Sequence, residues 1–164
     1  MPEKAKPSAS LISETERRLS ITFPPQLKAL YMLQNGGGLS DLWVPIIDKL
    51  SNNLDDWRGV FSHDYCDLVP LDQLETLHDV YLYSMSEDDI AKSKYSQKNA
   101  KRYILLSLRC ADATFLDYSQ SSFEPKVGIV DFERIDKNDV WFDTFDDFFA
   151  SLKRGELNYE DDDE

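Results

Sequence analysis

The sequence has 164 residues, of which 41% are hydrophobic and 12% aromatic; this is enough apolar material for a buried core and excludes a disordered acidic chain. Its 31 acidic and 18 basic residues give a formal net charge of -13, which excludes a nucleic-acid binder, because phosphate backbones are bound by clustered Lys and Arg. No apolar run approaches the ~20 residues of a membrane helix, so we expect one cytoplasmic domain with no membrane partner.

Two helices are predicted near the N-terminus. Residues 1–9 are polar with two prolines and predict a flexible lead-in. Ser10 is the expected cap of a first helix whose apolar positions are Leu11, Ile12, Thr15 and Leu19. A second helix is predicted over residues 25–34, beginning at Pro25, whose missing N–H has no intrahelical partner at a first helical position.

The second helix has a strong stop signal. Its expected inward face carries Leu27, Leu30, Tyr31 and Gln34. Met32 and Leu33 widen this apolar stripe. Asn35-Gly36-Gly37-Gly38 then supplies residues that tolerate a positive φ at a helix end.

The next segment predicts short extended elements. Residues 41–45 favour an edge strand, and the Asn- and Asp-rich residues 51–56 favour a loop. Trp57 and Phe61 are expected to return to the core.

Helical turns are expected after this segment. Residues 70–75 predict a helical turn that carries inward Leu71, Leu74 and Leu77. Residues 80–83 either continue this turn or form a strand. Ser86 is the expected cap of a further helix with basic residues toward its end.

The last third predicts a sheet and a closing helix. Consecutive antiparallel strands are expected over residues 103–108, 114–118 and 127–132. Thr144 caps a helix with an apolar stripe of Phe145, Phe148, Phe149 and Leu152, and Gly155 ends it. The fold class is therefore α+β, a single domain over residues 10–155 in which a mostly antiparallel sheet is flanked by the N-terminal helix pair and the C-terminal helix. Residues 156–164 form an acidic tail.

Several patterns resemble chemical sites, and each has a simpler interpretation. His63-Asp64-Tyr65-Cys66-Asp67, with His78, suggests a metal site, but structural zinc needs about four soft ligands in spaced pairs, so a surface loop is favoured. Cys66 and Cys110 are too few and too far apart for a disulfide framework, and no nucleophile signature surrounds either, so buried free thiols are favoured.

Three further patterns are also interpreted as structural. Asp131 and Glu133 fall on one face of an antiparallel strand, where solvated carboxylates are ordinary. The glycines 36–38 end a helix and lack the Lys and Ser/Thr of a phosphate loop. The basic residues 92–102 are interpreted as an exposed helix end. We therefore expect no catalytic residue, no metal and no cofactor.

A more specific pattern spans residues 19–38. Leu19-Ser20-Ile21-Thr22-Phe23-Pro24-Pro25-Gln26-Leu27, followed by Asn35-Gly36-Gly37, resembles the N-terminal signature of the SUKH superfamily, which contains the fungal cell-wall-assembly regulator and bacterial Syd-like proteins. Later pieces of the pattern follow in the same order over residues 69–74, 104–107, 115–117, 127–131 and 145–149. The chain departs from the family where Cys110-Ala111-Asp112-Ala113 replaces a Gly-rich hairpin, and where the proline is doubled.

The resemblance implies an α+β domain without catalytic residues, in which Pro24, Pro25, Asn35, Gly36 and Gly37 are structural motif residues. It also implies a bacterial immunity protein that neutralises a toxin, often a nuclease. An acidic inhibitor suits the basic surface of a nuclease, because opposite charges speed association. The alternatives are a regulatory or scaffold module of the same fold that binds a cellular partner, and a hydrolase or metal enzyme.

The partner-facing residues are a hypothesis drawn from the charge-rich loop. Asp55, Asp56, Asp64 and Asp67 lie around Trp57, which supplies an aromatic anchor. We expect this surface to face a basic toxin domain.

Overall fold

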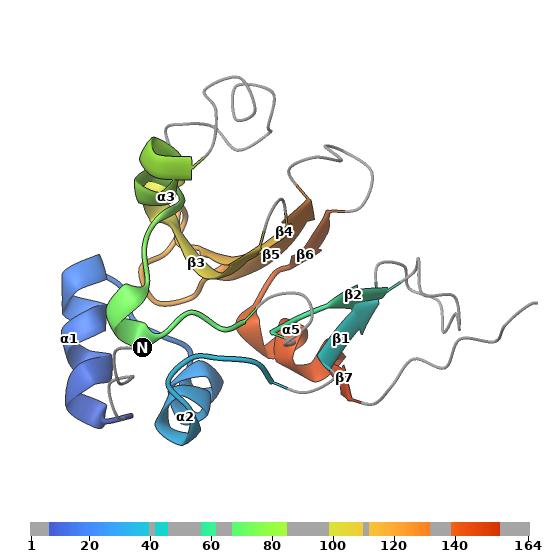
Figure 1. Ribbon diagram of the computed structural model, residues 1–164, viewed down its shortest axis with the longest axis horizontal. Coiled ribbons are helices and arrows are strands. Elements are labelled where there is room, and N and C mark those ends of the chain that lie inside the picture. The colour runs from blue at the N-terminus through green and yellow to red at the C-terminus, as the bar shows by residue number, and fades with distance from the viewer. Residues whose placement is uncertain are drawn as a thin grey trace, which may run out of the picture.

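The computed structural model describes residues 7–39, 42–45, 57–61, 67–84, 99–109, 112–131 and 139–154. Its elements in chain order are α1 (Ala9–Leu19), α2 (Pro25–Leu33), β1 (Leu42–Pro45), β2 (Trp57–Gly59), η2 (Leu71–Gln73), α3 (Leu77–Ser84), η3 (Ala100–Arg102), β3 (Tyr103–Arg109), β4 (Asp112–Asp117), β5 (Lys126–Asp131), β6 (Val140–Phe142), α5 (Phe145–Ser151) and β7 (Lys153–Arg154). Figure 1 shows the helices around two small sheets, so the α+β class is confirmed. The predictions for the loop at 51–56, the helix after Ser86 and the tail at 156–164 lie outside the described residues.

The larger sheet has four antiparallel strands in the order β3-β4-β5-β6. The three consecutive strands predicted from the sequence are confirmed as β3, β4 and β5, and β6 was not foreseen. Thr114 of β4 pairs with Ser107 on one side and Ile129 on the other. Asp112 and Ala113, expected in the hairpin turn, belong to β4 instead, because Asp112 pairs with Arg109.

The smaller sheet has the order β2-β1-β7. The prediction that residues 41–45 form an edge strand is wrong, because β1 is central and pairs with a neighbour on each side. Its second neighbour, β7, forms where the chain turns back after α5 and Lys153 pairs with Trp43. The predicted helix stop at Gly155 is therefore also wrong: α5 ends at Ser151, and Leu152 is already extended.

The N-cap of the first helix lies two residues before the predicted one. Ser8 is the N-cap, with an extended backbone, and its hydroxyl accepts a hydrogen bond from the backbone N–H of Leu11 at 3.1 Å. Ser10 lies inside the helix, because Ala9 already adopts the helical conformation. The predicted cap at Thr144 is confirmed: its hydroxyl accepts from the N–H of Asp147 at 3.0 Å.

The second helix is confirmed with Pro25 at its start, but its apolar stripe is narrower than predicted. Leu27 and Tyr31, one turn apart, are fully buried. Met32 and Leu33 lie further around the helix and are 47% and 85% exposed, so the expectation that they widen the inward stripe is wrong.

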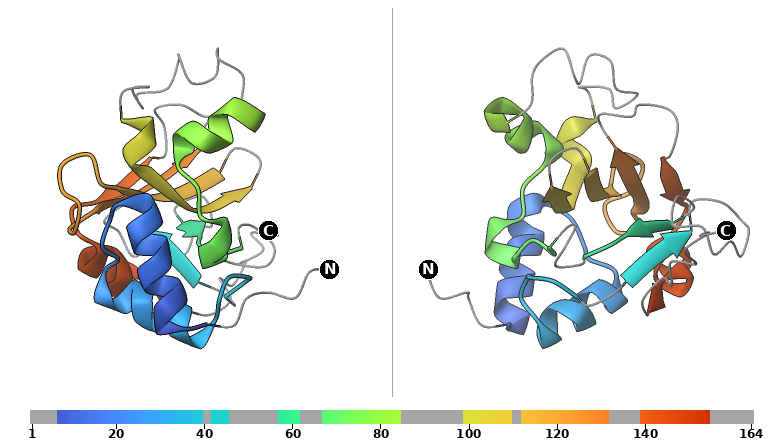
Figure 2. Two further views of the ribbon diagram at one scale, coloured as in Figure 1. Left: turned by 90° about the vertical axis from the view of Figure 1, so that its left-hand side faces the viewer. Right: turned by 45° about the vertical axis from the view of Figure 1, so that its right-hand side comes forward.

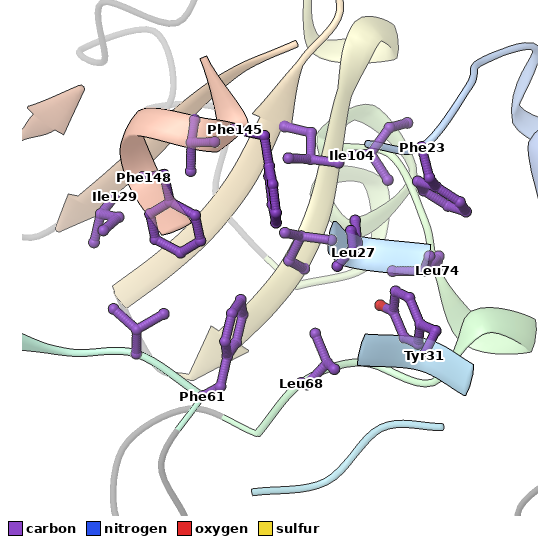
Figure 3. Packing of buried hydrophobic residues seen from close by; sticks show 14 of the residues in the cluster. Phe23, Leu27, Tyr31, Phe61, Leu68, Leu74, Ile104, Ile129, Phe145 and Phe148 are labelled. Atoms are coloured by element: carbon purple, nitrogen blue, oxygen red, sulfur yellow. The ribbon is translucent and has the colours of Figure 1, made fainter. Parts of the chain in front are cut away.

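The main core is formed by residues of the larger sheet together with residues of α1, α2, β1, η2 and α5 and their connections. Figure 2 shows the arrangement of these elements from two sides. Phe61, Leu71 and Leu74 are buried in this core as predicted. Phe148 is fully buried in it, and its ring is edge-on to that of Phe61 with 6.3 Å between the ring centroids. Figure 3 shows both side chains among their neighbours in the core.

A second cluster occupies the other face of the larger sheet. Residues of β3 alternate between the two: Ile104 and Leu106 belong to the main core, and Tyr103 and Leu105 to the second cluster. Leu77 brings α3 against this second face, and residues 80–83 continue that helix rather than forming a strand. In the parts of the chain that are described, no helix has the length and apolar character needed to cross a membrane.

Candidate functional site

The Asn35-Gly36-Gly37 motif joins the end of α2 to the segment before η2. Gly36 and Gly37 have φ values of 79° and 92°, as the stop signal predicted. The side chain of Asn35 is buried, and its Oδ1 accepts a hydrogen bond from the N–H of Leu71 at 2.8 Å. Gly37 forms a two-way backbone bridge with Leu68, at 2.8 and 3.1 Å. These bonds give the motif a structural role.

Pro24 and Pro25 direct the chain from α1 into α2. Pro24 is the N-cap residue and Pro25 the first helical residue. Glu16 of α1 accepts a hydrogen bond from the N–H of Phe23 at 2.6 Å and forms an ion pair with Lys28 of α2 at 2.8 Å. Glu16 therefore links α1 to the start of α2, where Pro24 is buried and Pro25 is exposed.

The loop surface predicted to face the partner is mostly outside the described residues. This applies to Asp55, Asp56 and Asp64. Trp57 lies in β2, and only its backbone is described. Asp67 is exposed beside Leu68. The predicted surface therefore stays a prediction.

The alternative metal and catalytic sites are likewise only partly described. Cys66, Cys110, His63 and Glu133 lie outside the described residues. Among the residues that are described, no three His, Cys, Asp or Glu side chains are grouped so that they could hold a metal ion.

A groove of about 330 Å³ opens between the start of α2, the β4–β5 connection and the start of α5. Figure 2, left, shows these segments beside one another, with the connection in orange. The groove is lined by Pro24, Pro25, Phe123, Glu124, Pro125, Thr144, Phe145 and Asp146. Phe145 is buried, whereas the ring of Phe123 is 65% exposed. The lining thus combines proline and phenylalanine surface with two carboxylates.

Hydrogen bonds fix the three segments that form this groove. Gln26 of α2 donates from Nε2 to Asp146 Oδ1 of α5 at 2.6 Å. The N–H of Thr22 donates to the carbonyl of Ser122 at 2.8 Å, which holds the β4–β5 connection against the link between α1 and α2. Within the connection, the hydroxyl of Ser121 accepts from the N–H of Glu124 at 3.0 Å. The groove therefore belongs to the folded frame rather than to a loose loop.

The rim of the groove is negative. Glu124 and Asp146 are both exposed, and neither forms an ion pair with the described part of the chain. The nearest lysines in these elements have other partners: Lys28 pairs with Glu16, and Lys126 with Asp143 at 2.7 Å.

The ion pair between Lys126 and Asp143 shifts the pKa values of both groups. The hydrogen bond and charge of Asp143 raise the pKa of Lys126, and those of Lys126 lower the pKa of Asp143. Both groups therefore stay charged and compensate each other beside the groove, so the charges of Glu124 and Asp146 are not offset by this lysine.

An exposed apolar surface adjoins the groove. We call it the α2 outer face; it consists of Pro25, Ala29, Met32 and Leu33, which are all exposed. It contains no charged side chain, and Pro25 belongs to both the face and the groove. Figure 1 places α2 at the edge of the molecule. A helix that is apolar on both its inward and outward sides is unusual on a surface unless something covers it.

Sequence reasoning missed both features, although each had a signal. In the part of the connection between Tyr118 and Pro125, Phe123 is the one large apolar residue, and it follows Ser119, Gln120, Ser121 and Ser122. Such an aromatic residue in a polar turn is a candidate surface anchor. Met32 and Leu33 are predicted to widen the inward apolar stripe of α2, but a nine-residue helix with six apolar residues besides its proline exposes some of them.

Comparison with known proteins gives one result that bears on this geometry. The family model described as "SMI1 / KNR4 family (SUKH-1)" matches residues 6–151, which include α1, α2, the larger sheet and the residues that line the groove; of the smaller sheet, β7 follows the matched range. No curated protein and no solved structure matched. Because the family match covers most of the 164 residues, and agrees with the resemblance at residues 19–38, the chain belongs to the SMI1/KNR4 (SUKH-1) family.

Proposed function

We propose that this chain is a non-enzymatic binding protein, an immunity protein that binds and neutralises a basic toxin domain of the nuclease type. The observation that supports this best is the groove with its adjoining α2 outer face. It combines exposed apolar side chains, such as Phe123 and Leu33, with the carboxylates of Glu124 and Asp146. Protein interfaces have this composition, an apolar centre with a polar rim.

Charge favours a basic partner. A nuclease needs positive surface to hold its phosphate substrate, and a chain of net charge -13 attracts such a surface. Opposite charge raises the association rate far above that of neutral proteins at low salt. A toxin that acts on nucleic acid must be stopped where that nucleic acid is, so we place the complex in the cytoplasm.

The test uses the full chain as bait in lysate of the source organism, with bound proteins released by rising salt and identified by mass. The released partner is then purified and assayed for nuclease activity with and without one equivalent of the chain. We expect a basic domain whose activity is lost on stoichiometric binding. A saturated complex that keeps its nuclease activity, or a partner that is not basic, would contradict neutralisation and favour a regulatory or scaffold module.

The acidic loop surface is part of this proposal and has its own test. Replacing Asp55, Asp56, Asp64 and Asp67 together by Asn removes four negative charges while keeping side-chain size. If these residues face the basic partner, the association rate at low salt should fall. An association rate equal to that of the wild type would remove this loop from the interface.

A further inference from the structure

We propose that the groove binds an arginine side chain of a basic protein partner, and that apolar residues next to this arginine pack on the α2 outer face. This inference rests on the proposed function, and names the contact through which it operates.

The size of the groove favours a side chain over a small-molecule ligand. Its volume of about 330 Å³ is at the lower end of the ~300–1,000 Å³ typical of ligand pockets. Its hydrogen-bonded frame, tied across by Gln26 and Asp146, is already formed without a partner. A preformed recess of this size lowers the ordering cost for one inserted side chain.

The chemistry of the lining favours arginine. Phe123 lines the groove and is 65% exposed, and a guanidinium binds favourably over an accessible aromatic ring. Glu124 and Asp146 approach from different segments and carry charges that Lys28 and Lys126 do not offset, because those lysines pair with other acids. A planar, permanently charged group with several N–H donors suits carboxylates around an apolar wall better than the compact, strongly hydrated ammonium of lysine.

The α2 outer face extends the same surface beyond the groove. It shares Pro25 with the groove and ends at Leu33, the most exposed large apolar side chain among the described residues. An arginine flanked by apolar residues would therefore place its charge at the acidic rim and its neighbours on Met32 and Leu33. Binding energy at interfaces concentrates at such buried arginine and apolar anchors.

A second copy of this chain fits the surface poorly. In a twofold contact the same patch meets itself, so the carboxylates of Glu124 and Asp146 would face carboxylates of the same kind. Each copy also carries a net charge of -13. A basic partner would avoid both repulsions, so we infer that the surface binds a different, basic protein and not a second copy of this chain.

The test titrates the ¹⁵N-labelled full chain with a blocked Leu-Arg-Leu peptide and with the same peptide in which citrulline replaces arginine. Citrulline keeps the shape of the side chain but has no charge. We expect amide shifts at Glu124, Asp146 and Leu33 with the arginine peptide, and at least fivefold weaker binding of the citrulline peptide. Equal binding of both peptides, or no shift at these amides, would overturn the proposal.

Variants separate the groove from the general acidity of the chain. Glu124→Gln with Asp146→Asn should weaken binding of the arginine peptide about tenfold. Each exposed pair of opposite charges contributes a factor of roughly two to five, and the double variant removes two such pairs. The control, Glu14→Gln with Asp72→Asn, removes the same charge from exposed positions on α1 and η2, outside the groove. Equal weakening by the two pairs would show that only net charge matters and would overturn the site.

The purified toxin partner distinguishes this inference from the proposed function. If Phe123→Ala with Leu33→Ser keeps full neutralisation and an unchanged dissociation rate, the groove is not the contact and the proposed function stands. Both side chains are exposed, so the fold should survive these changes. If the wild-type chain binds the arginine peptide at the groove but neutralises no nuclease, the site stands and the proposed function fails.

Discussion

Gly36→Ala tests whether the Asn35-Gly36-Gly37 motif holds α2 in place. Gly36 has a φ of 79°, a region that costs an L-residue roughly 1–2 kcal/mol. A Cβ at this position would lie 2.6 Å from Cγ and 2.8 Å from the backbone N of Pro70. Such overlap typically costs a further ~1–3 kcal/mol. The substitution should therefore destabilise the fold by about 2–5 kcal/mol.

Relief of this overlap is difficult because Pro70 is held on both sides. The carbonyl of Val69 accepts a hydrogen bond from the hydroxyl of Tyr31 at 2.9 Å, and the N–H of Leu71 donates to Asn35 Oδ1 at 2.8 Å. Moving the proline ring away would stretch both bonds, and each is buried or partly buried. A buried group left without its partner costs ~1–3 kcal/mol, so relaxation would exchange one penalty for another.

Urea unfolding followed by far-UV circular dichroism measures this effect. With a slope of about 2 kcal/mol per molar urea, the expected loss moves the midpoint by roughly 1–2.5 M. Gly38→Ala is the matched control, because Gly38 follows in the same segment but has no positive φ. If Gly36→Ala and Gly38→Ala had the same midpoint, the argument from backbone conformation and the contact with Pro70 would be refuted.

Three further substitutions test other parts of the fold. Gly37→Val places a β-branched residue at a φ of 92° and should cost on the order of 1 kcal/mol or more; an unchanged thermal midpoint would contradict this. Gly128→Ala places a Cβ 2.7 Å from Phe115 and 3.0 Å from Trp141, and should cost ~1–3 kcal/mol with a change in tryptophan fluorescence; wild-type values for both would show that the two rings move aside easily. Burial raises the pKa of Tyr31 above its usual value near 10, so the stability from the neutral phenol is complete below pH 10 and is lost as pH rises from 10 toward the folded-state pKa. Tyr31→Phe should therefore reduce the alkaline fall in unfolding free energy by about 1.4 kcal/mol per pH unit above pH 10, and an equal slope in both proteins would contradict burial of that phenol.

The parts of the fold that the sequence predicted correctly are those with local signals. The run of β-rich residues in β3, β4 and β5 needs no distant information, and neither does a proline at the start of α2 with glycines after its end. The elements that were missed depend on distant pairing. Lys153–Arg154 has no strand signal of its own and forms β7 only because Leu42 and Trp43 lie beside it.

The inward and outward sides of α2 show a second limit of prediction from sequence, after the dependence of β7 on distant pairing. Leu30, Met32 and Leu33 are similar in hydropathy, and periodicity alone permits more than one apolar face on a nine-residue helix. The choice is made by distant contacts: Tyr31 faces inward, where its hydroxyl reaches the carbonyl of Val69. Once that side is fixed, Met32 and Leu33 must lie outside.

Net charge shows a third limit of prediction from sequence. It predicts the sign of the partner's charge but not which residues contact the partner. Several acidic residues already have partners within the chain: Glu16 pairs with Lys28, Asp143 pairs with Lys126, and Asp147 accepts a hydrogen bond from the hydroxyl of Thr144 at 2.7 Å. An exposed acid at the edge of an interface changes mainly the association rate, whereas an apolar anchor beside a desolvated charge changes mainly dissociation. If the proposed partner contacts both the acidic loop and the groove, the two surfaces should therefore affect different rate constants of the complex. Loss of the loop charges should lower the association rate constant, and loss of Phe123 or Leu33 should raise the dissociation rate constant. Both constants measured on one complex therefore show which step each surface controls.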